Sequence, residues 1–170
     1  AYTISKSEKI KKIYCLPGNA GTEDIAENIS IDINNFKEVY EFLNKEEINL
    51  VVIGPEQPLA NGIVDFLEEC NVRVFGPNKI ASQLEGSKIF TKNLCKKYNI
   101  PTADFGVFQN IENAKNFLKS VNYPIVIKAD NLAAGKGVYI SKNFEEANLA
   151  VKEIFEGKFG VAKNVLIEEF

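Results

Sequence analysis

The chain has 170 residues, of which 45% are hydrophobic, 25% charged and 11% aromatic, and its formal net charge is −3. This composition is typical of a globular protein and excludes a disordered chain, a collagen-like repeat and a disulfide-dense secreted scaffold. The mild acidity argues against general nucleic-acid binding, and the absence of histidine excludes His metal sites and Ser–His–Asp triads within the chain. No apolar run is long enough to cross a bilayer and no signal peptide is recognisable, so we expect a cytoplasmic protein without a membrane partner.

Cys15, Cys70 and Cys95 are widely spaced, and we expect them to be reduced, buried thiols.

The first half of the chain alternates strands with amphipathic helices. Short β-branched and aromatic runs predict strands covered on both faces at 13–16, 50–53 and 72–75, with a weaker strand at 29–33. Apolar residues at helical spacing predict helices over 36–43 and 63–70. This alternation predicts an α/β fold with a parallel sheet up to about residue 80.

The second half begins with a helix predicted over 78–84, which Gly86 ends. Ser87 can cap the next helix, from 88 to about 98. Further strands are expected at 105–108, 125–128, 137–141 and 165–169, and further helices at 111–119 and 144–155. Asn143 and Glu146 form a predicted capping pair for the last helix. We place a domain boundary near Gly86.

Three strands of the first half end in a glycine–proline turn followed by a polar residue. These turns are Pro17-Gly18-Asn19, Gly54-Pro55-Glu56 and Gly76-Pro77-Asn78. Ligands of open parallel sheets bind outside the carboxyl ends of the strands, so the turns are candidates for a binding site. The alternative is that these residues only make the turns that strand–helix connections need.

The sharpest motif is the segment 125–138, Ile-Val-Ile-Lys-Ala-Asp-Asn-Leu-Ala-Ala-Gly-Lys-Gly-Val. Strand alternation places Lys128 on the face of Val126, at the exit of a buried strand. A loop of small residues follows, in which backbone N–H groups can surround a phosphate while lysines supply charge. The spacing fits neither a Walker A loop nor a Rossmann fingerprint. The alternative is a plain hairpin with a solvated Lys136 and a Lys128 that reaches along the surface to water.

Two further features bear on phosphate binding and on acid–base chemistry. Lys88 stands at a predicted helix start, where a cation opposes the helix dipole, so a bound phosphate nearby would offset an unfavourable charge. The alternative is a solvated surface lysine. Glu168 and Glu169 are adjacent in a predicted strand and point to opposite faces, so they cannot act together as an acid–base pair.

Together these residues resemble the ATP-grasp ligases, and among them the phosphoribosylamine–glycine ligases (glycinamide ribonucleotide synthetases) of de novo purine synthesis. The matching stretches run through most of the chain: 17–22, 54–59, 75–77, 83–88 with 90–92, 100–103, 125–138 and 167–170. The resemblance implies a Rossmann-like pre-ATP-grasp domain over 1–86, the start of the large ATP-grasp subdomain over 87–106, and an incomplete small lid subdomain over 107–170.

The same resemblance implies roles for individual residues. Lys88 and Lys128 would contact the phosphates of ATP. The loop that closes over those phosphates would consist of Ala133, Ala134, Gly135, Lys136 and Gly137. The backbone of Glu168, Glu169 and Phe170 would face the adenine. Gly18, Asn19 and Glu56 would lie on the side of 5-phosphoribosylamine.

The implied reaction is the ATP-dependent ligation of glycine to 5-phosphoribosylamine through glycyl phosphate, giving glycinamide ribonucleotide, ADP and phosphate. The resemblance also implies Mg²⁺, with ligands beyond Phe170 and none in this chain. The family's first strand and its Gly-Gly-Arg-Glu-His loop would precede Ala1, and the chain contains no methionine. We therefore expect a segment of a longer protein, a monomer that is inactive on its own.

Other readings of the sequence stay open. The chain could belong to a different ATP-grasp carboxylate–amine ligase, to a relative of biotin carboxylase, or to a nucleotide-binding module without catalytic activity. A nicotinamide oxidoreductase is disfavoured because no GxGxxG follows a strand of the first half.

The phosphoribosylamine–glycine ligases usually have glycine where Asn131 stands. Asparagine is the non-glycine residue that best tolerates a positive φ, so the turn can be kept.

Overall fold

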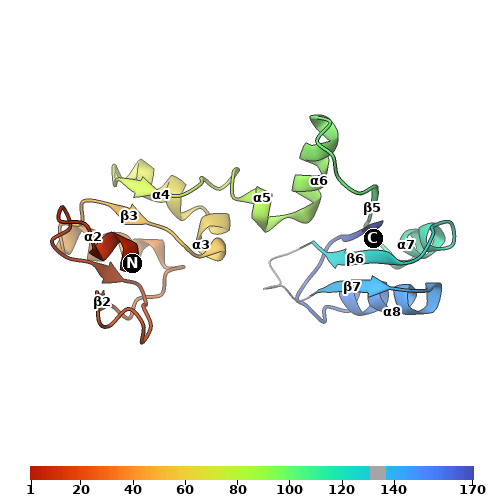
Figure 1. Ribbon diagram of the computed structural model, residues 1–170, viewed down its shortest axis with the longest axis horizontal. Coiled ribbons are helices and arrows are strands. Elements are labelled where there is room, and N and C mark those ends of the chain that lie inside the picture. The colour runs from red at the N-terminus through yellow and green to blue at the C-terminus, as the bar shows by residue number, and fades with distance from the viewer. Residues whose placement is uncertain (131–136) are drawn as a thin grey trace. The chain divides into compact units, whose positions relative to one another are not determined.

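The computed structural model describes residues 1–130 and 137–170 (Figure 1). The chain divides between Ile80 and Ala81 into two compact units, which are described separately. The expectations for Asn131, Ala133, Ala134, Gly135 and Lys136 fall outside the described residues.

The first unit, residues 1–80, contains four short strands in two parallel pairs. Its elements are α1 (Tyr2–Ser5), β1 (Tyr14–Cys15), β2 (Glu27–Asn28), α2 (Phe36–Lys45), β3 (Val51–Val52), α3 (Glu56–Asn61), α4 (Ile63–Glu69) and β4 (Val74–Phe75). β1 pairs with β2, and β3 pairs with β4. The expected parallel α/β arrangement is therefore confirmed.

The weaker strand expected at 29–33 is wrong in its position, because β2 covers only 27–28. The Ile29 N–H still donates to Cys15 O, but the Ile31 N–H donates back to Ile29 O. The backbone therefore turns away from β1 at Ile29, and Ile31 packs on the helical core instead of extending the strand.

The core of the first unit is made by the apolar faces of α2, α3 and α4. Its buried side chains are Val39, Leu43, Leu59, Ile63, Val64 and Leu67. Leu16 and Ile53, which directly follow β1 and β3, pack against this core. The turns that follow β1 and β3 are thereby held by burial of the residue that precedes each of them.

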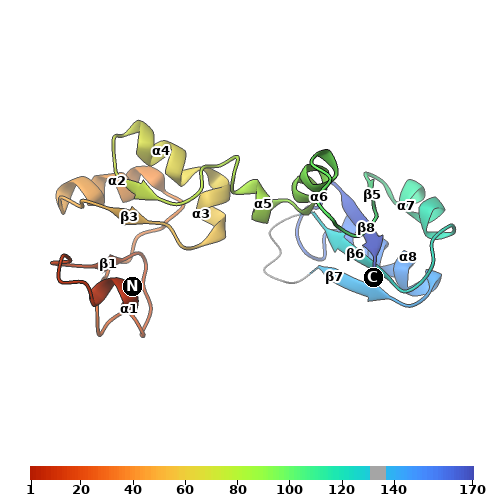
Figure 2. The same cartoon turned by 45° about the horizontal axis from the view of Figure 1, so that its top comes forward.

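The second unit, residues 81–170, is built on one antiparallel sheet with the strand order β5-β8-β6-β7 (Figure 2). Its elements are α5 (Gln83–Gly86), α6 (Lys88–Lys97), β5 (Phe105–Phe108), α7 (Ile111–Leu118), β6 (Ile125–Ala129), β7 (Val138–Ser141), α8 (Phe144–Phe155) and β8 (Val165–Glu169). α7 and α8 bury one face of this sheet in a core that includes Ile127, Val151 and Ile167.

Hydrogen bonds at the helix starts explain why the helices of this unit begin where they do. Ser87, Asn110 and Asn143 each accept, through the side chain, a hydrogen bond from the backbone N–H three residues later. Glu146 completes the predicted capping pair, since its carboxylate accepts from the Asn143 side chain at 3.1 Å. The expected helices at 88–98, 111–119 and 144–155 are confirmed to within one residue.

The helix expected over 78–84 is wrong, because α5 covers only 83–86. The Lys79 N–H instead donates to Asp65 Oδ2 of α4 at 2.7 Å, which ties this stretch to the first unit. The three cysteines are free, as expected, but half-buried rather than buried. Among the described residues, no helix has the length and apolar character that a membrane span requires.

Candidate functional site

The site candidate of the second unit lies on the sheet face that α7 and α8 do not cover. In the antiparallel register, Val126 stands opposite Glu168 and Lys128 opposite Leu166. Residues that stand directly opposite each other share a face, so these four side chains lie together. Ile127 and Ile167 point the other way, into the core. The predicted placement of Lys128 on the face of Val126 is confirmed.

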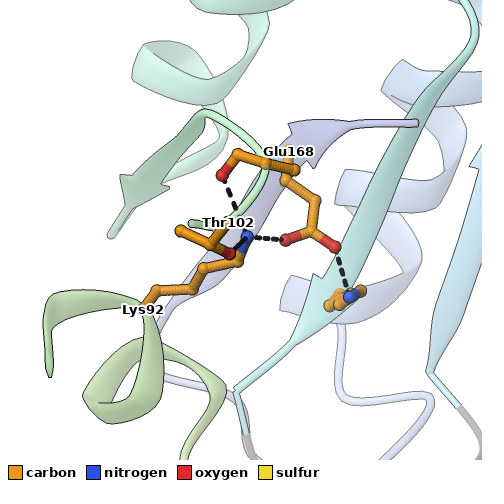
Figure 3. Close-up of polar contacts among 5 residues, drawn as sticks. Lys92, Thr102 and Glu168 are labelled. Carbon is orange, nitrogen blue, oxygen red and sulfur yellow. Dashed lines mark hydrogen bonds and ion pairs between the residues drawn. The ribbon is translucent and has the colours of Figure 1, made fainter. Parts of the chain in front are cut away.

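Glu168 lies between two lysines on this face. Its side chain is 7% exposed and forms ion pairs with Lys128, through Oε1, and with Lys92, through Oε2 at 2.6 Å. The Lys92 ammonium also donates to Thr102 Oγ1 at 2.7 Å and to the Ala103 carbonyl at 3.0 Å (Figure 3). The cluster has two cations and one anion, so it has an excess of positive charge.

The two lysines determine the protonation state of this carboxyl group. Burial raises the pKa of Glu168, because a charged carboxylate is poorly solvated there. Hydrogen bonds and charge from Lys128 and Lys92 act more strongly in the opposite direction, and the pKa of Glu168 falls below its ordinary value. Glu168 is therefore an ionised carboxylate at neutral pH.

The start of α6 is tied to the end of β6 by Asp130. Its Oδ1 accepts from the Ser87 hydroxyl and from the Ile89 backbone N–H, each at 3.1 Å. This carboxylate supplies the negative charge that the first turn of a helix favours. The chain itself thus provides a negative charge at the helix start where Lys88 stands.

A hollow of about 250 Å³ lies beside these residues, and Lys88, Lys92 and Lys128 all border it. Thr91, Cys95, Thr102, Leu84, Leu166 and Glu85 complete its wall. The sequence-predicted pair Lys88 and Lys128 is thus brought to one cavity from two separate elements. The volume is below that of a typical cofactor pocket, and with three lysines against one carboxylate the hollow suits an anionic group such as a phosphate.

A second hollow of about 500 Å³ lies at the other end of β8. Glu168, Glu169 and Phe170 border it, together with the start of β5 and the turn between α7 and β6. Glu168 therefore lines this larger hollow while its carboxylate is bonded to two lysines of the smaller one. Glu168 is buried and Glu169 is exposed, which is consistent with the predicted placement of the two carboxylates on opposite faces.

Gly137, the described end of the small-residue loop, is held in a conformation that favours glycine. Its φ is +86°, and a Cβ there would lie 3.2 Å from the ring of Phe159. Its carbonyl accepts from the Ala129 N–H at 2.9 Å, which closes the hairpin of β6 and β7. The hairpin considered as an alternative is thus present, and it carries Lys128 at the edge of the hollow.

The candidates of the first unit lie in two separate turns. Gly18 has a φ of +80°, and a Cβ there would lie 2.0 Å from Asn28 Oδ1. The Asn19 side chain accepts from the Gly21 N–H at 2.9 Å, so its oxygen shapes the turn. Glu56 is exposed at the start of α3. In the part of the chain that the structure describes, no hydrogen bond or ion pair joins Asn19 to Glu56.

Two residues of the second-unit site had no role assigned from the sequence. Lys92 follows Lys88 by one helical turn, a spacing that places both on one face of α6 and could have signalled a shared site. Asp130 lies in the conspicuous segment 125–138, but its partners at the start of α6 are 41 and 43 positions away. Nothing local in the sequence indicates that contact.

No metal site is formed by the described residues, since none of their His, Cys, Asp and Glu side chains gather in groups of three or more. Lysines surround the small hollow, and they repel a cation. The residues that the structure describes therefore do not fit a resident Mg²⁺ by themselves.

Known proteins resemble both halves of the chain. Residues 1–85 match the N domain of phosphoribosylglycinamide synthetase, and residues 86–170 match its ATP-grasp (A) domain. A phosphoribosylamine–glycine ligase of Mesorhizobium japonicum is 48% identical over the whole chain, which spans 40% of that relative. The chain thus covers well under half the length of the curated relatives that it matches.

Solved structures agree with this assignment. The phosphoribosylamine–glycine ligase of Thermotoga maritima superimposes with a TM-score of 0.76 at 34% identity, over 98% of this chain and 39% of that one. The N5-carboxyaminoimidazole ribonucleotide synthetase of Thermus thermophilus shares the fold, with a TM-score of 0.71 at 20% identity over 94% of this chain and 41% of that one. Because the two consecutive domain matches together extend from Ala1 to Phe170, the chain belongs to the phosphoribosylglycinamide synthetase family.

Proposed function

We propose that this chain is the part of a phosphoribosylamine–glycine ligase that binds the phosphates of ATP and one side of 5-phosphoribosylamine. The whole enzyme would use ATP to join glycine to 5-phosphoribosylamine and would release glycinamide ribonucleotide, ADP and phosphate. The observation that carries the proposal is the convergence of Lys88 and Lys128 on one basic hollow, in a chain that belongs to this family.

The lysines would act on charge rather than by forming covalent bonds. In the first step a carboxylate oxygen of glycine attacks the γ-phosphorus of ATP, and the bond to the ADP oxygen breaks. Negative charge builds up on the phosphate oxygens, and ammonium groups that are already in place lower its energy. Lys128, at the strand exit, and Lys88, at the helix start, are the groups that we assign to this task.

In the second step the amine of 5-phosphoribosylamine attacks the acyl carbon of glycyl phosphate, and phosphate leaves with the electron pair of the broken C–O bond. We place Gly18, Asn19 and Glu56 on the side of the amine substrate. The support is that both turns follow strands packed on the core of the first unit. Ligands of open parallel sheets bind outside such strand ends.

The division into domains remains part of the proposal. We assign residues 1–86 to the pre-ATP-grasp domain, 87–106 to the start of the large ATP-grasp subdomain, and 107–170 to its small lid subdomain. Gly137 would form the described end of the phosphate loop, and Glu169 and Phe170 would lie near the adenine. Mg²⁺ would be held by residues outside the described set. We further expect a cytoplasmic monomer that binds neither nucleic acid nor membrane.

The test is an ADP-release assay on the full-length protein, with glycine, 5-phosphoribosylamine or ATP omitted in turn. We expect repeated turnover to ADP only when all three are present, because glycine and ATP without the amine can give at most one ADP per enzyme, as glycyl phosphate forms. ADP formation with a different acid or amine would point to another ATP-grasp ligase. ATP binding without any turnover would point to a module without catalytic activity, and either result contradicts the proposal.

A further inference from the structure

The Lys92 ammonium group is held by three protein groups. Its side chain is 11% exposed, and the Nζ atom lies 2.7 Å from Thr102 Oγ1, 3.0 Å from the Ala103 carbonyl and 2.6 Å from Glu168 Oε2 (Figure 3). Two of these contacts are hydrogen bonds and the third is an ion pair, since Glu168 Oε2 receives no hydrogen bond of good geometry among the described residues. Although Lys92 borders the small hollow, its ammonium is thus directed to the protein.

Lys128 is placed differently. Its side chain is 27% exposed, it borders the same hollow, and its ion-pair partner is Glu168. Among the residues that the structure describes, its ammonium has this one partner, and an ammonium with one acceptor keeps donors for a ligand. Lys128 is therefore the lysine that can leave its ion pair with Glu168 and bind a phosphate, while Lys92 keeps its contact with Glu168.

The transfer of Lys128 to a phosphate has a consequence for Glu168. This carboxylate is almost completely buried, and Oε2 accepts no hydrogen bond of good geometry within the described residues. A buried carboxylate that loses its only counter-charge is strongly destabilised. Glu168 avoids this because the Lys92 ammonium is 2.6 Å from Oε2 and is held there by Thr102 and Ala103.

We propose that Lys92 is a positioning residue, which keeps Glu168 paired so that Lys128 can leave it and bind a phosphate of the nucleotide. Lys92 acts through Glu168 and does not contact the nucleotide. The inference rests on the proposed function, because it takes the anion in the hollow to be a phosphate of ATP.

The proposal predicts a change in proton binding when Lys92 is replaced by an uncharged residue. With Lys92 absent and Lys128 drawn to a phosphate, burial alone acts on Glu168 and raises its pKa. Nucleotide binding should then carry a proton onto Glu168. Among the described residues, the other charged groups that line the two hollows are Glu85 and Lys88 at the small one and Asp104 and Glu169 at the larger one. All four remain in both proteins, so they do not account for a difference between them.

The experiment measures ADP and ATP binding by isothermal titration calorimetry in the full-length protein. It compares the wild type with Lys92→Met, Lys92→Arg, the double variant Lys92→Met/Glu168→Gln, and Lys96→Met. Lys96 is an exposed lysine of the same helix and serves as the matched control. Each protein is titrated at a pH of about 6 and of about 8, in two buffers of different ionisation enthalpy, which gives the number of protons taken up.

We expect Lys92→Met to weaken nucleotide binding by at least about tenfold at the higher pH, with proton uptake and a smaller loss at the lower pH. Lys92→Arg and Lys96→Met should bind nearly as the wild type does, without proton uptake. The double variant should recover much of the lost affinity, because Glu168→Gln leaves no buried, unpaired carboxylate when Lys128 moves to the phosphate.

The inference is overturned if the wild type binds ATP but Lys92→Met binds it equally well, or binds it more weakly by the same factor at both pH values without proton uptake. If the wild type itself binds no adenine nucleotide, the proposed function fails, which is a different outcome. If Lys92→Met does not fold, Lys92→Arg and the double variant still test the proposal. Equal losses of nucleotide affinity in these two variants would then refute it, and near-native affinity in both would support it.

Discussion

The contact between Asp130 and the start of α6 can be tested by removing its carboxylate. Asp130→Ala deletes the acceptor of two hydrogen bonds, from the Ser87 hydroxyl and from the Ile89 N–H. Hydrogen bonds to charged groups contribute about 1.5–3 kcal/mol each, and the lower end applies because the site is half-buried and water can replace part of the loss. We therefore expect a loss of about 2–3 kcal/mol from the stability of α6.

Asp130→Asn provides the matched control. The amide oxygen can still accept both hydrogen bonds, but both become neutral and the interaction of the negative charge with the helix dipole is lost, so we expect a smaller loss of about 1–2 kcal/mol. Ser87→Ala should lie between the two, because it removes the capping hydrogen bond to the Phe90 N–H as well as one contact with Asp130.

Hydrogen exchange is the suitable assay, since the chain has two units whose unfolding need not coincide. Protection of the α6 amides should fall by about 30-fold or more in Asp130→Ala. The amides of α8, which lie in the core of the unit, report whether the whole unit has weakened. Equal protection of the α6 amides in Asp130→Ala and the wild type would refute the role of Asp130 at the start of α6. Equal protection in Asp130→Asn and Asp130→Ala would refute it as well.

Three further outcomes are expected. Lys128→Ala in the full-length protein should weaken ATP binding and abolish ADP formation without changing the circular dichroism spectrum; unchanged ADP formation would remove Lys128 from the site. Gly18→Ala should lower the thermal midpoint of the first unit, because the added Cβ would lie 2.0 Å from Asn28 Oδ1 at a φ of +80°. Gly21→Ala, where the nearest atom would be 3.3 Å away, is the control, and equal effects of the two would contradict the steric argument. Glu168 has a lowered pKa, so its ion pairs stabilise the folded state above the pKa of the unfolded chain, and this stability is lost as the pH falls through the lower, folded value. Denaturant titrations at several acidic pH values should therefore show a shallower pH dependence for Glu168→Gln, and parallel curves would exclude this contribution.

Local signals predicted most of the secondary structure of the second unit. The strands at 105–108 and 165–169 and the helix at 144–155 coincide with β5, β8 and α8. The caps and the alternation of apolar residues that define these elements act within a few residues of chain. The helix expected over 78–84 is absent before Gln83, and the Lys79 N–H there is bonded to Asp65, 14 residues away, a contact that no local pattern records.

The site was predictable only where its residues carry a local signal in the sequence. Lys88 and Lys128 stood out through their local settings, and both border one hollow. The partners that hold this site together come from distant parts of the chain: Glu168 joins β6 to α6, and Asp130 joins the end of β6 to Ser87. The sequence argument sought an anion near Lys88 and named a phosphate, because the tertiary contact that brings in a carboxylate is not visible in the sequence.

The central position of β8 has a consequence for biosynthesis. Of the four described strands of this sheet, β8 leaves the ribosome last, yet it pairs with both β5 and β6. Until it emerges, β5 has no neighbour among these strands, and the β6–β7 hairpin is the pairing that can form. A nascent chain should therefore acquire the fold of this unit in one late step. Glu168 arrives with that strand, so the lysines of the hollow gain their shared counter-charge at the same moment.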